Sequence, residues 1–277
     1  SKGYTRMNER TVDVLLVGAG AMSTTLGVML QELDPNLKIA MVERLDHVAY
    51  ESTDGLNNAG TGHAAYCELN YTPQQADGSI NCSKAYAINA SYEVSLQLWS
   101  YLVGKGALPF PKKFINPTPH CSLVWGEENV QFLRARYAAL SQHHQFSDME
   151  YSEDPEVISQ WMPLVMHNRP AGEALAATRV RYGSDVNFGE LARFLVNYLE
   201  LKENFELLLS RYVTDLEQRE DGRWTVRLKH SARPDTELVH AKFVFLGAGG
   251  GALPLLQKSG IPEGRGWIDS LLQLVNE

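Results

Sequence analysis

The chain of 277 residues has little of what several classes of protein require. Its three cysteines, Cys67, Cys82 and Cys121, form no CxxC pair, and no histidine pair lies near them at metal-ligand spacing. This argues against a disulfide framework and against a zinc site, and it predicts reduced thiols, no bound metal and a cytoplasmic location. No run approaches the ~18 apolar residues of a membrane-spanning helix, and residues 1–10 are too polar for a signal peptide.

Positive charge is also scarce. The formal net charge is -8 and the pI is about 5.5, and no cluster of Lys and Arg is present. Nucleic-acid binding needs such a cluster to neutralise phosphates, so a nucleic-acid partner is not expected. With 44% hydrophobic and 21% charged residues, the composition is that of a globular protein with one large or two ordinary domains.

Residues 11–43 are predicted to form a strand, a helix and a second strand. Residues 11–17 are a nearly continuous apolar run that ends at Gly18, which is typical of a buried parallel strand. A helix is predicted over 21–33 and a second buried strand over 38–43, which together make a right-handed βαβ unit. The buried face of this helix is predicted to carry Leu26, Leu30 and Leu33.

Further elements follow from periodicity and from capping and turn residues. Helices are predicted over 83–103, 127–142, 187–202 and 252–258. Strands are predicted over 121–125, 177–182, 205–210, 212–219, 223–229 and 242–246. Asn187 and Glu190 form a capping box at the start of their helix, and Asp221 with Gly222 predicts a hairpin turn. Residues 144–186 offer no clear boundaries apart from the strand within them.

The turn after the first strand resembles the GxGxxG fingerprint of dinucleotide-binding domains. Gly18 and Gly20 occupy the first two glycine positions, and Ser23 is a small residue at the third. Glu43 ends the second strand near the spacing expected of a carboxylate that accepts ribose hydroxyls. We therefore expect a dinucleotide site rather than a glycine turn in an ordinary doubly wound sheet.

The stretch that follows indicates which dinucleotide. A nicotinamide-binding domain would normally continue with another strand and helix after Glu43, whereas residues 42–73 are rich in Gly, Asn, Ser and Thr. A loop this long is either functional or flexible. FAD extends past its pyrophosphate and has more polar surface than NAD, so it could be the ligand of this loop. A second glycine-rich strand end at 247–251 is positioned to return to the same sheet and to approach the same cofactor.

Several long strings give the chain a family resemblance. They are GAGAMSTTLG from Gly18, MVERLDHVAYESTDGLNNAGTGHAAYCELNYTPQ from Met41, FINPTPHCSLVWGEENVQFLRARYAAL from Phe114, GSDVNFGELARFL from Gly183 and KFVFLGAGGGALPLLQKSGIPE from Lys242. Together, over residues 12 to about 264, they resemble the FAD-dependent malate:quinone oxidoreductases. The resemblance implies oxidation of (S)-malate to oxaloacetate, with electrons passed to membrane quinone by an enzyme held peripherally on the inner face of the cell membrane.

The resemblance also implies a fold class and a domain plan. The fold class is α/β, an FAD-binding Rossmann-like domain of the glutathione-reductase type with an inserted, partial α+β substrate domain. Residues 1–110 and 186–266 are expected to form the FAD-binding domain, and 111–185 the substrate domain. Family members continue well beyond the GIPE string, so a truncated form is expected, and 267–277 is predicted to be a terminal helix that packs on its own domain.

Spacing and resemblance together assign the cofactor contacts. Gly18, Gly20 and Ser23 are expected at the pyrophosphate, and Glu43 with Arg44 at the adenosine end. The remaining cofactor-binding candidates are Asn58, Gly60, Thr61 and Gly62 along the flavin, Val213 at the adenine, and Gly247, Ala248 and Gly249 at the ribityl and phosphate region.

Oxidation of a 2-hydroxy acid needs a base for the hydroxyl proton and cations for the carboxylates. His63 and His120 are the candidate catalytic residues, because imidazole can act as base or donor near neutral pH, although a structural role is open for each. Arg179 and Arg181 are candidate carboxylate clamps. The other two arginines considered, Arg134 and Arg136, are expected to form solvated pairs with Glu127 and Glu128.

Three alternatives stay open at this point. The chain could act on another 2-hydroxy or amino acid with FAD, or it could be a non-catalytic FAD-binding fragment. An NAD-dependent dehydrogenase is the third alternative, and the missing third strand argues against it.

Overall fold

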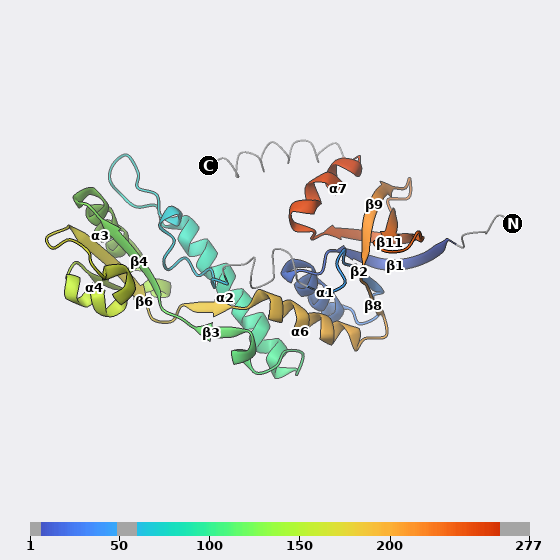
Figure 1. Ribbon diagram of the computed structural model, residues 1–277, viewed down its shortest axis with the longest axis horizontal. Coiled ribbons are helices and arrows are strands. Elements are labelled where there is room, and N and C mark those ends of the chain that lie inside the picture. Colours follow the sequence, from blue (N-terminus) through green and yellow to red (C-terminus); the bar gives the residue numbers. More distant parts are fainter. Residues whose placement is uncertain (1–6, 49–59, 261–277) are drawn as a thin grey trace. The chain divides into compact units, whose positions relative to one another are not determined.

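The computed structural model describes residues 7–48 and 60–260 (Figure 1). The chain divides into two compact units, which are described separately. Within the described residues, the first unit contains 7–48, 107–109 and 187–260, and the second contains 60–106 and 110–186. Residues 60–106 therefore group with the central part of the chain, whereas the sequence-based plan placed them with the cofactor domain.

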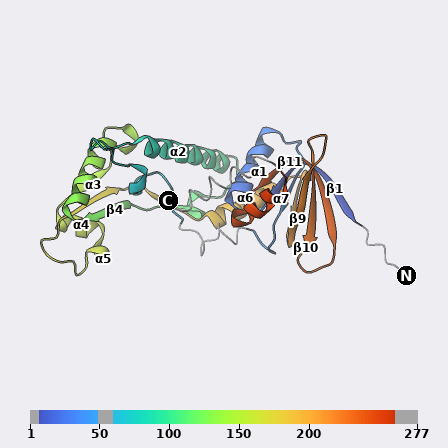
Figure 2. The same cartoon turned by 90° about the horizontal axis from the view of Figure 1, so that it is seen from above.

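The first unit is built on a six-stranded mixed sheet with the order β8-β2-β1-β11-β10-β9. Its strands are β1 (Asn8–Val17), β2 (Ile39–Val42), β8 (Phe205–Leu208), β9 (Arg211–Gln218), β10 (Trp224–His230) and β11 (Thr236–Leu246). The strands β8, β2, β1 and β11 run parallel, and β10 and β9 continue the sheet antiparallel from β11 (Figure 2). The predicted hairpin at Asp221 and Gly222 joins β9 to β10.

The core of this unit lies between the parallel strands and the antiparallel ones, which curl over them. Its buried residues come from all six strands and are Leu15, Val17, Ala40, Val42, Leu208, Leu216, Val226, Leu228, Val239 and Ala241. The chain passes from β8 to β9 in two residues, and Ser210 N–H donates to Leu45 O at 2.8 Å. The start of β9 is thereby fixed at the carboxyl end of β2.

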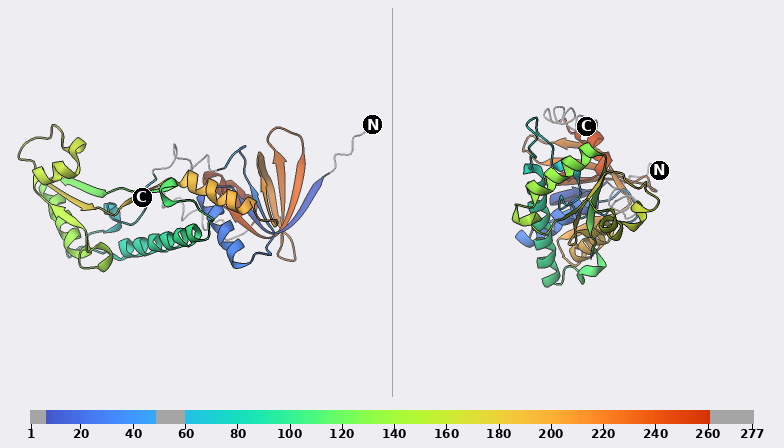
Figure 3. Two further views of the ribbon diagram at one scale, coloured as in Figure 1. Left: turned by 90° about the horizontal axis from the view of Figure 1, so that it is seen from below. Right: turned by 90° about the vertical axis from the view of Figure 1, so that its left-hand side faces the viewer.

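Three helices complete the first unit. α1 (Ala21–Leu33) and α6 (Phe188–Glu200) pack against each other, as the blue and gold helices of Figure 3 show. The short α7 (Ala252–Lys258) packs on β9 and β11 after a 3-10 turn at Gly249–Gly251. At the start of α6, the Asn187 side chain accepts the Glu190 N–H at 3.0 Å, which confirms the Asn187 half of the predicted capping box, whereas Glu190 Oε1 accepts from Arg193 Nη1 at 2.6 Å.

The leucine face of α1 is only partly its buried face, since Leu26 and Leu30 are half-buried. The residues that α1 buries are Ser23, Thr24, Gly27, Val28 and Gln31, whereas the predicted Leu33 is 81% exposed. Close packing is the reason, because a Cβ atom on Gly27 would lie 3.0 Å from Leu16 Cδ1 and 3.1 Å from Leu199 Cδ1. A helix that begins directly at a tight turn lies too close to the sheet for leucines, so small residues face inward.

The second unit contains two small antiparallel sheets. One has the order β4-β6-β5, from β4 (His120–Trp125), β6 (Leu175–Val180) and β5 (Glu150–Ser152), and the other pairs β3 (Ile115–Pro117) with β7 (Ser184–Val186). Its helices are α2 (Ser83–Gly104), α3 (Glu127–Leu140), α4 (Pro155–Trp161) and α5 (Pro163–Met166). Short 3-10 turns lie at Leu69–Tyr71, Pro111–Lys113 and His144–Phe146. Residues 144–186, which had no clear boundaries in the sequence, contribute α4, α5 and three strands.

Candidate nucleotide-binding site

The ends of three parallel strands meet around Gly18. The Gly18 N–H donates to Val42 O at 2.7 Å, and the Gly247 N–H donates to Val17 O at 2.8 Å. Gly18 has φ +93°, and a Cβ atom there would lie 2.6 Å from Gly247 O, so only glycine fits. The two glycine-rich strand ends, distant in sequence, are therefore side by side in one sheet.

The helix that follows the turn offers backbone donors to a ligand. Gly20 is the N-cap of α1, with extended backbone at φ -84° and ψ -175°. The first N–H groups of a helix lack intrahelical partners and carry the positive end of its dipole. This combination suits a phosphate group.

Glu43 connects the glycine turn to the end of β2. Its Oε2 accepts the Ala19 N–H at 2.9 Å, and its Oε1 accepts the Leu45 N–H at 3.1 Å. Two backbone donors fix the carboxylate, and each oxygen keeps a further lone pair for a ligand hydroxyl. The spacing seen in the sequence thus corresponds to a contact in the structure.

These groups open into a pocket of about 350 Å³ at the carboxyl ends of β1, β2 and β11. Its lining comes from the glycine turn, the end of β2, the start of β9 and the turn before α7. The lining residues are Val17, Gly18, Ala19, Gly20, Val42, Glu43, Arg44, Arg211, Tyr212, Val213, Gly247, Ala248, Gly249, Gly251, Pro254, Leu255 and Lys258. A crevice outside the carboxyl ends of parallel strands is where open α/β sheets bind ligands.

Most of the residues expected from the sequence at the nucleotide lie on this pocket. They are Gly18, Gly20, Glu43, Arg44, Val213, Gly247, Ala248 and Gly249. Ser23 is not part of the lining, since it is fully buried beneath the turn and a Cβ atom on Gly247 would collide with its Oγ. Ser23 and Gly247 therefore keep α1 close to the end of β11.

The flavin-side candidates have a different setting. Gly60, Thr61 and Gly62 belong to the second unit, where they pair with β7. The Gly62 N–H donates to Ser184 O at 2.8 Å, and Thr61 forms a bridge with Asp185. Asn58 lies outside the described residues.

The rest of this loop is held by buried side chains. Four consecutive carbonyl groups, those of residues 64–67, each accept a side-chain hydrogen bond. The donors are Asn89 of α2, Arg136 of α3 and Ser122 of β4, and Arg136 Nε also donates to Thr72 Oγ1 at 2.9 Å. Residues 64–72 are thus ordered by neighbouring elements, in contrast to a merely flexible loop.

The four arginines considered in the sequence all have protein partners, and not those expected. Arg134 Nη2 pairs with Glu153 at 2.6 Å, and Arg136 is fully buried rather than solvated. Burial lowers the pKa of Arg136 to about 10. Arg179 and Arg181 each donate from Nε and Nη2 to the Glu150 oxygens, and the Arg179 guanidinium also lies over the Trp161 ring at 4.7 Å, so neither is an open carboxylate clamp.

The two candidate histidines differ in exposure. His63 has a side chain that is 59% exposed, and its Nδ1 lies 3.2 Å from Glu68 Oε1. His120 is buried, and its Nε2–H donates to Ser184 O at 3.1 Å, while its Nδ1 has no partner within the described part of the chain. The Ser184 side chain contacts the Tyr92 hydroxyl, so His120 lies in a polar cluster of the second unit.

Among the lining residues that the sequence did not assign to the cofactor, those on β9 and α7 are Arg211, Tyr212, Pro254, Leu255 and Lys258. They reach the pocket because β9 begins beside Glu43 and because Lys258 Nζ donates to Thr214 O at 3.3 Å, which ties α7 to β9. No local pattern carries this information, since it depends on how β9 crosses the sheet.

Within residues 7–48 and 60–260, no group of three or more His, Cys, Asp or Glu side chains is arranged to hold a metal ion. None of the helices in these ranges combines the length and the apolar character needed to cross a membrane. The three cysteines are free, and burial together with the Glu68 charge raises the pKa of Cys67 to about 11.

The glycine turn, the fixed carboxylate and the pocket at the strand ends are features of the dinucleotide-binding class of α/β fold. Solved structures share the fold. A glycine oxidase from Geobacillus kaustophilus matches with a TM-score of 0.62 and 15% identity, over 90% of this chain and 58% of that one. An L-α-glycerophosphate oxidase from Mycoplasma pneumoniae, solved with FAD bound, matches with a TM-score of 0.60 and 16% identity, over 86% and 54%. The predicted fold class is confirmed.

The sequence comparisons give the family. The model of the malate:quinone oxidoreductase family matches residues 10–269. Probable malate:quinone oxidoreductases from Hahella chejuensis and Pseudomonas aeruginosa are 62% and 56% identical over 261 residues, which is 94% of this chain. The chain belongs to the malate:quinone oxidoreductase family. It spans about half the length of these curated relatives, 52% and 50% respectively.

Proposed function

We propose that the pocket of the first unit binds the ADP half of FAD, and that the chain serves the FAD-dependent oxidation of (S)-malate to oxaloacetate with electrons passed to membrane quinone. The observation that carries the proposal is the meeting of two glycine-rich strand ends with a fixed carboxylate at one pocket. Family membership supports malate as the substrate and quinone as the acceptor.

The residues present fit an adenine dinucleotide. The absence of a side chain on Gly18 lets the glycine turn and the end of β11 lie side by side, and the N-terminus of α1 provides donors for the pyrophosphate. Glu43 is held by Ala19 and Leu45 in a position to accept ribose hydroxyls. The pocket volume of about 350 Å³ suits part of a dinucleotide, and its lining includes Gly18, Gly20, Glu43 and Val213, which the sequence assigns to the pyrophosphate, the ribose and the adenine.

FAD supplies the two-electron acceptor when bound. The protein has to take the hydroxyl proton of the substrate, and we propose His120 and His63 for this task. A neutral His120 that donates from Nε2 to Ser184 O carries its lone pair on Nδ1, which is the form a base requires. His63 Nδ1 lies 3.2 Å from Glu68 Oε1. The peripheral location at the inner membrane face belongs to the same proposal.

The absorption spectrum of the purified chain after incubation with FAD tests this function. Bound flavin that loses its yellow colour on anaerobic addition of L-malate, and keeps it with D-malate, lactate or glycine, is the expected result. Bleaching by lactate or glycine instead would assign a different substrate. Bound flavin that none of these acids bleaches would make the chain an FAD-binding module without turnover, and a chain that binds no FAD would refute the proposal as a whole.

A further inference from the structure

Arg211 is a pocket residue that the glycine fingerprint does not include. It is the first residue of β9, and its backbone N–H donates to Glu43 O at 3.1 Å, which places it at the Glu43 end of the pocket. Val213 lies two residues further along the same strand and also lines the pocket. Residues two apart on a strand share a face, so the Arg211 and Val213 side chains lie on the same side of β9.

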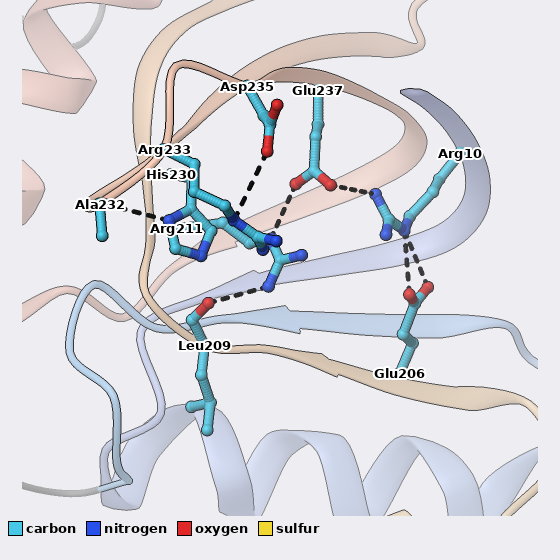
Figure 4. A network of polar contacts seen from close by, with 9 residues as sticks. All are labelled: Arg10, Glu206, Leu209, Arg211, His230, Ala232, Arg233, Asp235 and Glu237. Atoms are coloured by element: carbon cyan, nitrogen blue, oxygen red, sulfur yellow. Dashed lines mark hydrogen bonds and ion pairs between the residues drawn. The ribbon is translucent and has the colours of Figure 1, made fainter. Parts of the chain in front are cut away.

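The Arg211 guanidinium is the end of a row of four alternating charges from four strands (Figure 4). Arg10 Nε donates to both oxygens of Glu206 at 3.0 Å, and Arg10 Nη1 lies 3.3 Å from Glu237 Oε1. Glu237 Oε2 accepts from Arg211 Nε at 2.8 Å, and Arg211 Nη1 donates to Leu209 O at 2.9 Å. Two directed bonds from different nitrogens fix the plane of the guanidinium.

Glu237 balances the charge of Arg211 within the protein. It is 7% exposed, and burial would raise its pKa, but the hydrogen bond from Arg211 and the charge of Arg10 outweigh burial and lower that pKa. The carboxylate is therefore ionised at neutral pH and compensates the guanidinium. An already paired guanidinium offers a ligand little additional charge, but a guanidinium plane can also bind an aromatic ring by stacking on it.

We propose that Arg211 recognises the adenine ring of the nucleotide by stacking its guanidinium on the base, and that Glu237, held by Arg10, is the positioning residue for that plane. The inference rests on the proposed FAD site and adds a residue that distinguishes adenine from other bases. The glycine turn and Glu43 would contact the pyrophosphate and the ribose, so they do not distinguish an adenine nucleotide from one with another base.

Calorimetric titration of the whole chain with ADP and with inorganic pyrophosphate tests the inference. Arg211→Lys keeps the positive charge but removes the planar guanidinium. We expect this variant to bind ADP about tenfold more weakly and to bind pyrophosphate as the wild type does. Glu237→Gln should weaken ADP binding severalfold and should add little in the Arg211→Lys background, because both changes act on one contact. Arg219→Lys, whose side chain is about half exposed near the hairpin turn, is the matched control and should bind like the wild type.

The outcomes separate the two proposals. An Arg211→Lys protein that is folded by circular dichroism and binds ADP as tightly as the wild type overturns the stacking role. Equal loss of ADP and pyrophosphate affinity also overturns it, because the effect would then lie at the phosphates. Full additivity of the two substitutions refutes the positioning role of Glu237. A wild-type chain that binds neither FAD nor ADP refutes the proposed function itself.

Discussion

The amide N–H of Ala19 donates a 2.9 Å hydrogen bond to Oε2 of Glu43, and this contact joins the glycine turn to the strand beside it. Leu45 N–H fixes the other oxygen of the same carboxylate at 3.1 Å. Glu43, which the sequence predicts to contact a ribose, is therefore also a structural link between the glycine turn and β2. Its substitution should affect both the stability of the fold and nucleotide binding.

Glu43→Gln tests this double role. An amide can accept at only one of the two positions and places an N–H group opposite a backbone donor, so we expect a loss of about 1 kcal/mol in the free energy of unfolding and about tenfold weaker FAD binding. Urea denaturation and flavin fluorescence measure the two effects. Glu217→Gln changes an exposed carboxylate of the same sheet and should alter neither quantity. Unchanged FAD affinity in Glu43→Gln would remove Glu43 from the site.

Gly18→Ala tests the close approach of the two strand ends. Gly18 has φ +93° and lacks room for a Cβ atom beside Gly247 O, so both backbone strain and collision oppose the alanine, and we expect a loss of roughly 3 kcal/mol. Gly222→Ala is the matched control, because Gly222 has φ +82° but a Cβ atom added there would have no other atom within 4 Å. It should lose only about 1 kcal/mol and retain FAD binding. Equal losses for both variants would show that collision plays no part.

Arg136→Lys tests the bracing of residues 64–72. A lysine cannot reproduce the fork that donates to Ala65 O, Tyr66 O and Thr72 Oγ1, so at least one buried acceptor loses its partner. We expect a loss of roughly 2 kcal/mol and faster proteolytic cleavage within 64–72. Arg134 lies on the same helix, and its side chain is 56% exposed. The Arg134→Lys variant is therefore the matched control, and its unfolding midpoint and proteolytic cleavage pattern should match those of the wild type. A cleavage rate unaltered by Arg136→Lys would contradict the bracing role.

The Glu150 pair predicts an acid-dependent loss of stability. Hydrogen bonds from Arg179 and Arg181 lower the pKa of Glu150 from 4.5 to about 2. A carboxyl group with a depressed pKa in the folded state stabilises the fold above its ordinary pKa, and this contribution is lost as pH falls from 4.5 toward 2. Because the side chain is partly exposed, the effect should be about 0.5–1 kcal/mol. Stability measured against pH should be flatter in that window for Glu150→Gln, and as steep as the wild type for Glu93→Gln, an exposed carboxylate on α2.

Local signals predicted the elements around the pocket well. The strand, glycine turn and helix from Asn8 to Leu33, the N-cap at Asn187 and the hairpin at Gly222 each depend on neighbouring residues, and all three are present. The pairing of β1 with β11 was anticipated because both end in glycine-rich turns. Such signals are readable because their physical causes lie within a few residues.

What the sequence could not show depends on distant contacts. The inward face of α1 was only partly predicted because its leucines follow helical periodicity, whereas the distance between helix and sheet selects Gly27 and Ser23. Arg136 looks like a surface residue of α3, and only the carbonyl groups of residues 65 and 66 explain its burial. Arg211 enters the pocket because β9 starts beside Glu43, which no pattern near Arg211 indicates.

Competition between nucleotides tests the central claim most directly, namely that the carboxyl ends of β1, β2 and β11 hold the ADP half of FAD. The wild-type chain is titrated with FAD while flavin fluorescence is recorded, first alone and then with increasing ADP or FMN. The account predicts saturable FAD binding that ADP displaces competitively and FMN does not. FAD binding that persists unchanged at saturating ADP, or that FMN displaces while ADP fails to, would contradict it.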